Sequence, residues 1–285
     1  MIIFAFEMQI LKAKMTKATS LNDWVDHEMI RGRYIFTKKD VLSLQLPISE
    51  QAILNCLNRL TERGVIMSPW QNFYVAIPTE YRLKGVVPPT FYIDRLMKFL
   101  GRDYYVSLLS AAAMNGASHQ QPMVFQVTVN GKPIRSGVKN GTRLEFTLRQ
   151  NLPLEFTQQL KTQTGYMTVA GPELTALDVV AEEKKIGGLS RAAEVLQELS
   201  ETTVWNKKKL PLLTHYRSGT LQRLGYLFEL IEAQQQADDL YDMISQTDKV
   251  LRKVPLKKKA PVDDNMPVNT RWKIIENYKL EIDEI

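Results

Sequence analysis

The stretch between positions 36 and 78 constrains the fold of this chain more than any other. It begins with a short helical pattern that Pro47 ends, continues with a second helical pattern, and closes with two short apolar runs around a polar turn. Ser49 suits the cap of the second helix and Gly64 its end, so the pattern predicts a helix from Ser49 to Arg63. Helix, turn, helix and hairpin in this order are typical of a winged helix-turn-helix.

The second helix of this stretch has two different faces. Apolar residues recur at helical spacing and predict one buried face, formed by Ile53, Cys56, Leu57 and Leu60. The opposite face carries amide and guanidinium side chains, at Gln51, Asn55, Asn58 and Arg59. In the major groove of DNA, Asn and Gln pair with adenine and Arg pairs with guanine. This face is therefore a candidate for reading bases, although a solvated surface helix shows the same pattern.

The flanks of the second helix add to the candidate DNA-binding surface. Thr37 and Asp40 have the spacing of a capping box, whereas Lys38 and Lys39 in the same first turn oppose the helix dipole and favour a nearby phosphate. Two strands, 65–67 and 73–77, are expected around a turn at 68–72. The full set of predicted DNA-binding residues is Lys38, Lys39, Ser49, Gln51, Asn55, Asn58, Arg59, Arg63 and Gln71. Because one such helix reads only a few base pairs, we expect a dimer on DNA.

Length, charge and cysteine content set limits on the whole chain. The 285 residues suggest about two domains, and a hydrophobic content of 44% suffices for real cores. A net charge of +6 favours a polyanionic partner. The single cysteine, Cys56, excludes an internal disulfide and fits a reducing compartment. The first residues lack the pattern of a secretory signal, and no run is apolar enough to span a bilayer, so we expect a cytoplasmic protein without a membrane segment.

The expected fold class is α+β, with an N-terminal winged helix-turn-helix followed by a larger mixed α/β domain. The first domain is placed at residues 1–85, with a first helix over 21–30 capped by Ser20; the role of residues 1–18 stays open. The proline-bounded passage 78–89 is the expected linker, and the second domain is placed at 90–285. Its strands are expected between 120 and 170, and helices dominate 172–245.

Within the second domain, each expected element has its own local pattern. Helices are predicted at 91–100, 104–115, 172–180, 189–199, 218–233 and 238–244. Strands are predicted at 123–129, 144–148, 166–170 and 272–277. Basic residues gather at 207–209 and at 252–259, in segments that are usually solvated loops.

Three runs of the second domain, at 104–127, 164–180 and 187–199, resemble the AbiEi antitoxins of bacterial abortive-infection systems. The likeness extends in order and spacing from the winged helix to the closing RWKIIEN segment. It implies an antitoxin that is encoded beside an AbiEii-type nucleotidyltransferase toxin and acts in phage defence. It also implies that the winged helix binds inverted repeats in operator DNA to repress the operon, and that the larger domain counters the toxin. Family members often have a histidine where this chain has Asn115, which argues against a chemical role for that position.

Patterns of catalysis are sparse in this sequence. There is no Gly-rich phosphate loop and no nucleophile elbow, and His27, His119 and His215 lie far apart. The nearest approach to a nuclease site is Asp178 with Glu182 and Lys184, at a helix end where exposed charges are normal. We therefore predict no catalytic residue, no metal and no cofactor.

Three functions remain open at this point. The first is a repressor that is also an antitoxin, which an adjacent nucleotidyltransferase gene would favour. The second is a stand-alone transcription regulator with a ligand-sensing second domain, which a deep apolar pocket would favour. The third is a metal-dependent nuclease, which a divalent ion at Asp178 would favour. The basic segments at 207–209 and 257–259 fit several ways of neutralising a toxin.

Overall fold

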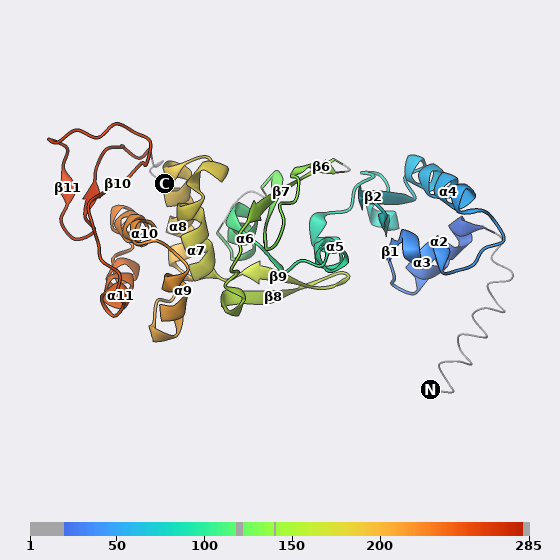
Figure 1. Cartoon of the computed structure of the whole chain (residues 1–285), viewed down its shortest axis with the longest axis horizontal. Coiled ribbons are helices and arrows are strands. Elements are labelled where there is room, and N and C mark those ends of the chain that lie inside the picture. The colour runs from blue at the N-terminus through green and yellow to red at the C-terminus, as the bar shows by residue number, and fades with distance from the viewer. Residues whose placement is uncertain (1–19, 118–121, 140, 282–285) are drawn as a thin grey trace. The chain divides into compact units, whose positions relative to one another are not determined.

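The computed structural model describes residues 20–117, 122–139 and 141–281 (Figure 1). Residues 1–18, whose role the sequence leaves open, and His119 lie outside this part. The chain divides into two compact units of mixed helix and strand. One unit runs to Gly101 and includes Gly137–Arg143 and Lys161–Tyr166; the other consists of Arg102–Ser136, Leu144–Leu160 and the chain from Met167 onward. The expected α+β class is confirmed.

The first unit begins with three helices and a small sheet. The helices are α2 (Leu21–Ile30), α3 (Lys38–Leu42) and α4 (Glu50–Glu62), and the strands are β1 (Ile35–Thr37), β2 (Ile66–Trp70) and β3 (Phe73–Ala76). The strands form an antiparallel sheet in the order β1-β3-β2. Each helix starts at its predicted cap, since the hydroxyl groups of Ser20, Thr37 and Ser49 accept hydrogen bonds from backbone N–H groups.

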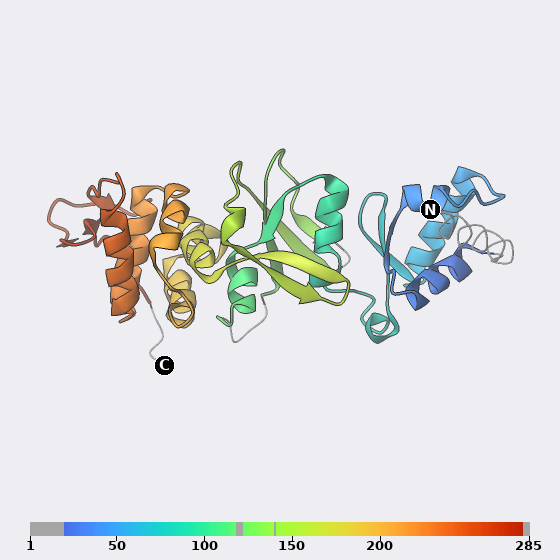
Figure 2. The same ribbon diagram turned by 90° about the horizontal axis from the view of Figure 1, so that it is seen from below.

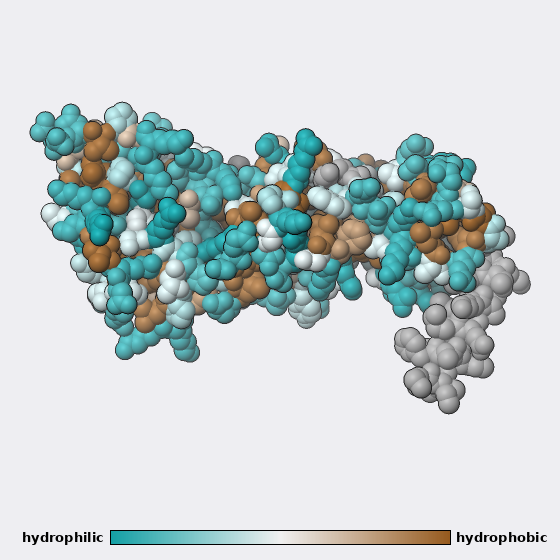
Figure 3. Space-filling view, in the orientation of Figure 1, coloured by the Kyte–Doolittle hydropathy of each residue, from teal (hydrophilic) through white to brown (hydrophobic). Residues whose placement is uncertain are grey.

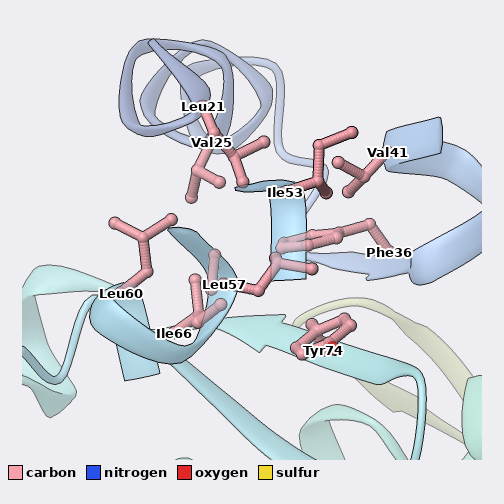
Figure 4. Packing of buried hydrophobic residues seen from close by; sticks show 10 residues of the cluster. Leu21, Val25, Phe36, Val41, Ile53, Leu57, Leu60, Ile66 and Tyr74 are labelled. Carbon is pink, nitrogen blue, oxygen red and sulfur yellow. The ribbon is translucent and has the colours of Figure 1, made fainter. Parts of the chain in front are cut away.

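The core of this region joins residues from all three helices and the sheet (Figure 4). Phe36 is central: its ring lies edge-on to Trp24 at 5.2 Å and stacks on Tyr74 at 5.6 Å. Leu57 of α4 has no exposed surface. Cys56, expected in the core, is only half-buried at its margin, where its Sγ accepts a hydrogen bond from Arg59.

The hairpin between β2 and β3 is tighter than predicted. The turn was expected to span 68–72, but β2 continues to Trp70, so that only Gln71 and Asn72 form the turn, with Asn72 at φ 62°. Pro69 is tolerated within β2 because the strand lies at the sheet edge and its register shifts between Met67 and Trp70.

The remainder of the first unit contains two 3-10 turns, η1 (Thr79–Tyr81) and η2 (Pro89–Phe91), and the helix α5 (Ile93–Leu100). The hairpin tip at 161–166 packs in the same unit. The hydroxyl of Tyr81 bonds Oε1 of Gln163 at 3.1 Å, and the hydroxyl of Thr164 donates to the carbonyl of Phe91.

A six-stranded sheet in the order β6-β7-β5-β4-β9-β8 organises the middle of the chain. The strands are β4 (Tyr104–Val106), β5 (Val124–Val129), β6 (Gly137–Lys139), β7 (Thr142–Leu148), β8 (Thr157–Thr162) and β9 (Gly165–Ala170). β4 pairs antiparallel with β5 and parallel with β9.

One predicted helix of this region is wrong in its first turn. Residues 104–115 were expected to be helical throughout, but Tyr104–Val106 is the strand β4, and the helix α6 (Leu108–Met114) begins only after Ser107. Two tyrosines and a valine favour strand, and all three are buried between β5 and β9. A short apolar run without alternation is compatible with a helix and with a strand, so the sequence pattern alone could not exclude a helix at residues 104–106.

The helical part of the second unit consists of α7 (Pro172–Ala181), α8 (Leu189–Ser200), α9 (Leu210–Thr214), α10 (Ser218–Leu230) and α11 (Gln234–Ser245), with η3 (Leu154–Phe156), η4 (Glu183–Lys185) and η5 (Lys207–Lys209). α10 and α11 lie side by side in both ribbon views (Figure 2). α10 ends earlier and α11 begins earlier than predicted.

The chain closes with a small sheet in place of the single strand expected at 272–277. It has the order β10-β12-β11 and is formed by β10 (Val254–Pro255), β11 (Val268–Asn269) and β12 (Ile274–Ile275). Trp272, just before β12, is fully buried against Gly225 of α10.

Hydrophilic residues cover much of the face shown in Figure 3. Across the described ranges, no helix is both long and apolar enough to cross a membrane.

Candidate functional site

The exposed face of α4 is the first candidate site. Gln51, Asn55, Asn58 and Arg59 are all exposed, as the helical spacing predicted. The amide of Gln51 donates to Oδ1 of Asn55 at 3.2 Å, and the guanidinium of Arg59 folds back on its own helix, with Nε 3.4 Å from the carbonyl of Asn55. These contacts are local and solvent-exposed, so an incoming hydrogen-bonding partner can replace them at little cost.

The other predicted DNA-binding residues occupy different settings. Lys38 is engaged in an ion pair, 2.6 Å from Oε1 of Glu50, that ties α3 to α4. Ser49 and Arg63 are the two caps of α4, Lys39 is exposed in α3, and Gln71 is exposed in the hairpin turn. The structure thus gathers the base-reading candidates on one helix face and leaves Lys38 already paired.

A pocket in the second unit is the second candidate site, with a volume of about 270 Å³. Its walls come from the sheet strands β4, β5 and β7, from α7, and from the start of α10. Polar and charged side chains dominate the lining. At its base, four residues from four different segments form one hydrogen-bonded network: Tyr105, Arg149, Asp178 and Tyr216.

Asp178 is the centre of this network and is only 5% exposed. Its Oδ2 accepts a hydrogen bond from the hydroxyl of Tyr105 at 2.9 Å, and its Oδ1 accepts one from the hydroxyl of Tyr216 at 2.5 Å and one from Arg149 at 3.1 Å. The expectation of an exposed charge at a helix end was wrong, because α7 is buried along nearly its whole length. Its partners lie 29, 38 and 73 residues away in sequence, so no local pattern pointed to them.

Arg149 compensates the buried carboxylate. It also donates to the carbonyl of His215 at 3.1 Å, and its guanidinium lies 4.5 Å from the ring centre of Tyr216. Burial opposes the charge of Arg149, but Tyr216 and Asp178 more than offset this and raise its pKa. Burial raises the pKa of Asp178, and Arg149 counteracts part of that rise. The pair is a charged, partly desolvated contact in which each partner depends on the other.

Of the three residues that the sequence suggested for a nuclease site, Asp178 and Glu182 line the same pocket and Lys184 does not. Both oxygens of Asp178 are engaged by the network, while Glu182 pairs with Lys185 at 3.1 Å. Lys185 in turn donates to the hydroxyl of Thr147 at 2.9 Å, and Lys184 is exposed. Within the residues that the structure covers, no group of three or more His, Cys, Asp or Glu side chains is arranged to hold a metal ion.

The side chain of Asn115 forms hydrogen bonds that connect neighbouring elements. Its amide donates to the carbonyl of Ala170 at 3.0 Å, and its Oδ1 accepts a bond of 2.6 Å from Gln158. It thereby ties the end of α6 to the strands β8 and β9.

Two residues of the basic segments have partners within the chain. Lys209 pairs with buried Glu173 at 2.7 Å, and Lys257 lies 3.8 Å above the ring of Tyr278.

The tyrosines of the network predict a loss of stability at alkaline pH. Burial raises the pKa of Tyr105 and Tyr216 well above the ordinary value of 10.0. Above pH 10 the unfolded chain therefore loses phenolic protons that the folded chain keeps, so the stabilisation present below pH 10 declines as pH rises. Each tyrosine should contribute about 1.4 kcal/mol per pH unit to this decline.

Urea unfolding between pH 9 and 11 measures this effect. Tyr105→Phe and Tyr216→Phe should each flatten the fall in unfolding free energy, whereas Tyr166→Phe, at a tyrosine that is 58% exposed, serves as the control. A slope that is identical in all four proteins would show that the buried phenols are not responsible.

A family model for the AbiEi antitoxin C-terminal domain matches residues 105–230. The match begins at Tyr105 and contains Arg149, Asp178 and Tyr216, so the whole network lies within it. Residues 105–230 of this chain therefore form a domain of the AbiEi antitoxin type. The resemblance of the second domain to AbiEi antitoxins is thereby confirmed, and it supports a role in a toxin–antitoxin system.

Solved structures extend the comparison to the fold of the chain. The RV2827C protein from Mycobacterium tuberculosis is similar with a TM-score of 0.64 and 12% identity, over 88% of each chain. At this identity the likeness concerns the fold alone. An antigenic nucleotidyltransferase-like protein from Paracoccidioides brasiliensis reaches a TM-score of 0.35 and 11% identity, over 56% of this chain and 92% of that one. Comparison with curated proteins gave no match.

Proposed function

We propose that this chain is an antitoxin that also represses its own operon. The observation that carries the proposal is the AbiEi antitoxin domain at 105–230, preceded by a helix whose exposed face bears amide and guanidinium groups. In this proposal the larger C-terminal domain counters a nucleotidyltransferase toxin of the AbiEii type, and the N-terminal region binds inverted repeats in operator DNA.

The DNA-binding part of the proposal treats the first unit as a winged helix-turn-helix. α3 and α4 are the helix-turn-helix, β2 and β3 are the wing, and α4 enters the major groove with Asn55, Asn58 and Arg59 towards the bases. In this proposal the exposed side chains of Lys39 and Gln71 contact phosphate. Lys38 can contact phosphate only after its ion pair with Glu50 breaks, because the carboxylate neutralises the charge of the lysine.

Arg59→Ala should weaken operator binding by about 1 to 3 kcal/mol and relax the sequence preference at the bases it contacts. The reason is that a guanidinium on the groove side of α4 makes a bidentate bond with guanine that alanine cannot replace. A fluorescence titration of the full chain on operator and scrambled duplexes measures both effects.

Arg33→Ala is the matched control, since Arg33 is an exposed arginine of the same unit outside α4. Equal affinity of the Arg59 variant and the wild type for the operator would contradict the placement of α4 in the groove. The stoichiometry of the same titration tests the expected dimer, which should place two chains on an inverted repeat.

A stand-alone regulator with a ligand-sensing second domain is the rival function. It would be favoured by a deep apolar pocket. The pocket of the second unit instead contains an ionic network and measures about 270 Å³, which is small for a drug-sized apolar ligand. The antitoxin proposal therefore has the stronger support.

A further inference from the structure

The pocket above the Asp178 network holds more cationic charge than its own carboxylates neutralise. Asp178 is paired with Arg149, and Glu182 is paired with Lys185. Arg217 and Lys258 also line the pocket, and no ion pair within the described chain joins either of them to a carboxylate. Two cationic groups therefore face a cavity whose acidic groups are already engaged.

Hydroxyl groups inside the same pocket are unpartnered. Thr128 and Thr220 line the cavity and are only 3% and 7% exposed. In the described part of the chain no hydrogen bond engages either side-chain hydroxyl, and neither oxygen is among the fully enclosed unpartnered atoms, so each remains accessible to a ligand. Thr128 stands opposite Tyr105 in the β4–β5 register, and Thr220 lies in the first turn of α10, so the two hydroxyls approach the cavity from different elements.

Cationic groups and hydroxyl groups that line one pocket together favour a phosphate monoester as the ligand. A phosphate monoester carries a charge of about −1.5 to −2 near pH 7 and three acceptor oxygens. Two unpaired cations match that charge, and hydroxyl donors match the oxygens. The arginine can offer a planar pair of donors, and the lysine a compact charge. A neutral or cationic ligand would leave Arg217 and Lys258 without an ion-pair partner.

We propose that this pocket of the second unit binds a phosphate monoester, held by Arg217 and Lys258 and by the hydroxyl groups of Thr128 and Thr220. The volume of about 270 Å³ accommodates a phosphate with a small organic group attached. Burial and the nearby Arg223 lower the pKa of Lys258, and the charges of Glu183 and Glu182 offset only part of this effect, so a bound anion would further favour the charged lysine. The site lies entirely within the second unit, so it does not depend on whether α4 binds DNA.

Calorimetric titration of the full chain with inorganic phosphate and with ribose 5-phosphate tests the site. The wild type should show a single saturable site for a phosphate compound. Lys258→Gln and Arg217→Gln should each weaken binding by roughly tenfold to a hundredfold, because each removes a charge-assisted hydrogen bond. Thr220→Val, which keeps the shape of the side chain, should weaken binding less.

Lys259→Gln is the matched control, since Lys259 is the exposed neighbour of Lys258 and does not line the pocket. It should bind as the wild type does. Equal unfolding temperatures and near-ultraviolet circular dichroism establish that the variants are folded. The absence of saturable binding to every phosphate compound, or losses as large for Lys259→Gln as for Lys258→Gln, would overturn the proposal.

A further comparison distinguishes the source of the phosphate. A short single-stranded oligonucleotide is titrated with and without a 5′-phosphate. Saturable binding of ribose 5-phosphate or free phosphate assigns the pocket to a small ligand. Preference for the phosphorylated oligonucleotide, with no binding of the small compounds, assigns it to a phosphate at the end of a polymer. No preference for the phosphorylated strand and no binding of the small compounds would refute the site.

Discussion

Arg149→Met is expected to lower the free energy of unfolding by about 3 to 5 kcal/mol. The substitution keeps most of the side-chain volume but removes the cation that lies 3.1 Å from Oδ1 of Asp178. Asp178 would then be a buried carboxylate with only the phenols of Tyr105 and Tyr216 as donors. The large cost comes from leaving this charge uncompensated, since the net contribution of an intact buried pair is small.

Chemical denaturation of the wild type and of two further variants checks this account. Adding Asp178→Asn to Arg149→Met should recover much of the loss, because an amide carries no charge to compensate. Arg143→Met removes an exposed arginine from β7, the strand that ends just before Arg149, and should change the stability by less than about 0.5 kcal/mol. A double variant that is no more stable than Arg149→Met would show that the charge of Asp178 is not the cause.

Gly225→Ala is expected to destabilise the chain by about 3 kcal/mol, although alanine is the better helix former by about 1 kcal/mol. A Cβ at this position would lie 2.0 Å from Cη2 of Trp272, far inside contact distance. The indole has no exposed surface, and the carbonyl of Trp272 accepts a hydrogen bond of 2.6 Å from Gln222, so the ring has little room to move. Overpacking therefore outweighs helix propensity.

The same helix provides the control for this prediction. Gly219→Ala places a Cβ 3.3 Å from the end of the Arg223 side chain, a tight contact with a much smaller penalty. Thermal unfolding should thus separate the two variants clearly. In a Trp272→Leu background the cost of Gly225→Ala should shrink, because the clashing ring is gone. An equal cost in both backgrounds would rule out the indole as the obstacle.

Local signals in the sequence were enough for the helices α2, α3 and α4 of the first unit, but they did not predict the strand β1. The start of α4 follows from Ser49, and the start of α3 follows from the capping box between Thr37 and Asp40, whose bonds span three residues. The exposed and buried faces of α4 follow from helical spacing alone. Such interactions act between near neighbours, so a single sequence contains all the information needed to predict them.

The candidate site in the second unit could not be predicted, because it is formed by contacts between residues that lie far apart in the sequence. Asp178 meets Tyr105 from 73 residues away, and Trp272 meets Gly225 from beyond three further elements. The strand at Tyr104–Val106 likewise owes its structure to β5 and β9 on either side. Sequence patterns place side chains on a face of an element, but only tertiary packing determines which faces meet.

Co-expression of this chain with an AbiEii-type nucleotidyltransferase toxin tests most directly whether antitoxic action and DNA recognition reside in different parts of it. The full chain carrying Asn55→Ala, Asn58→Ala and Arg59→Ala should restore growth as the wild type does, while failing to repress an operator-driven reporter. Protein levels are matched by immunoblot. Loss of growth rescue in this folded variant, or failure of the wild-type chain to rescue growth, would contradict the account.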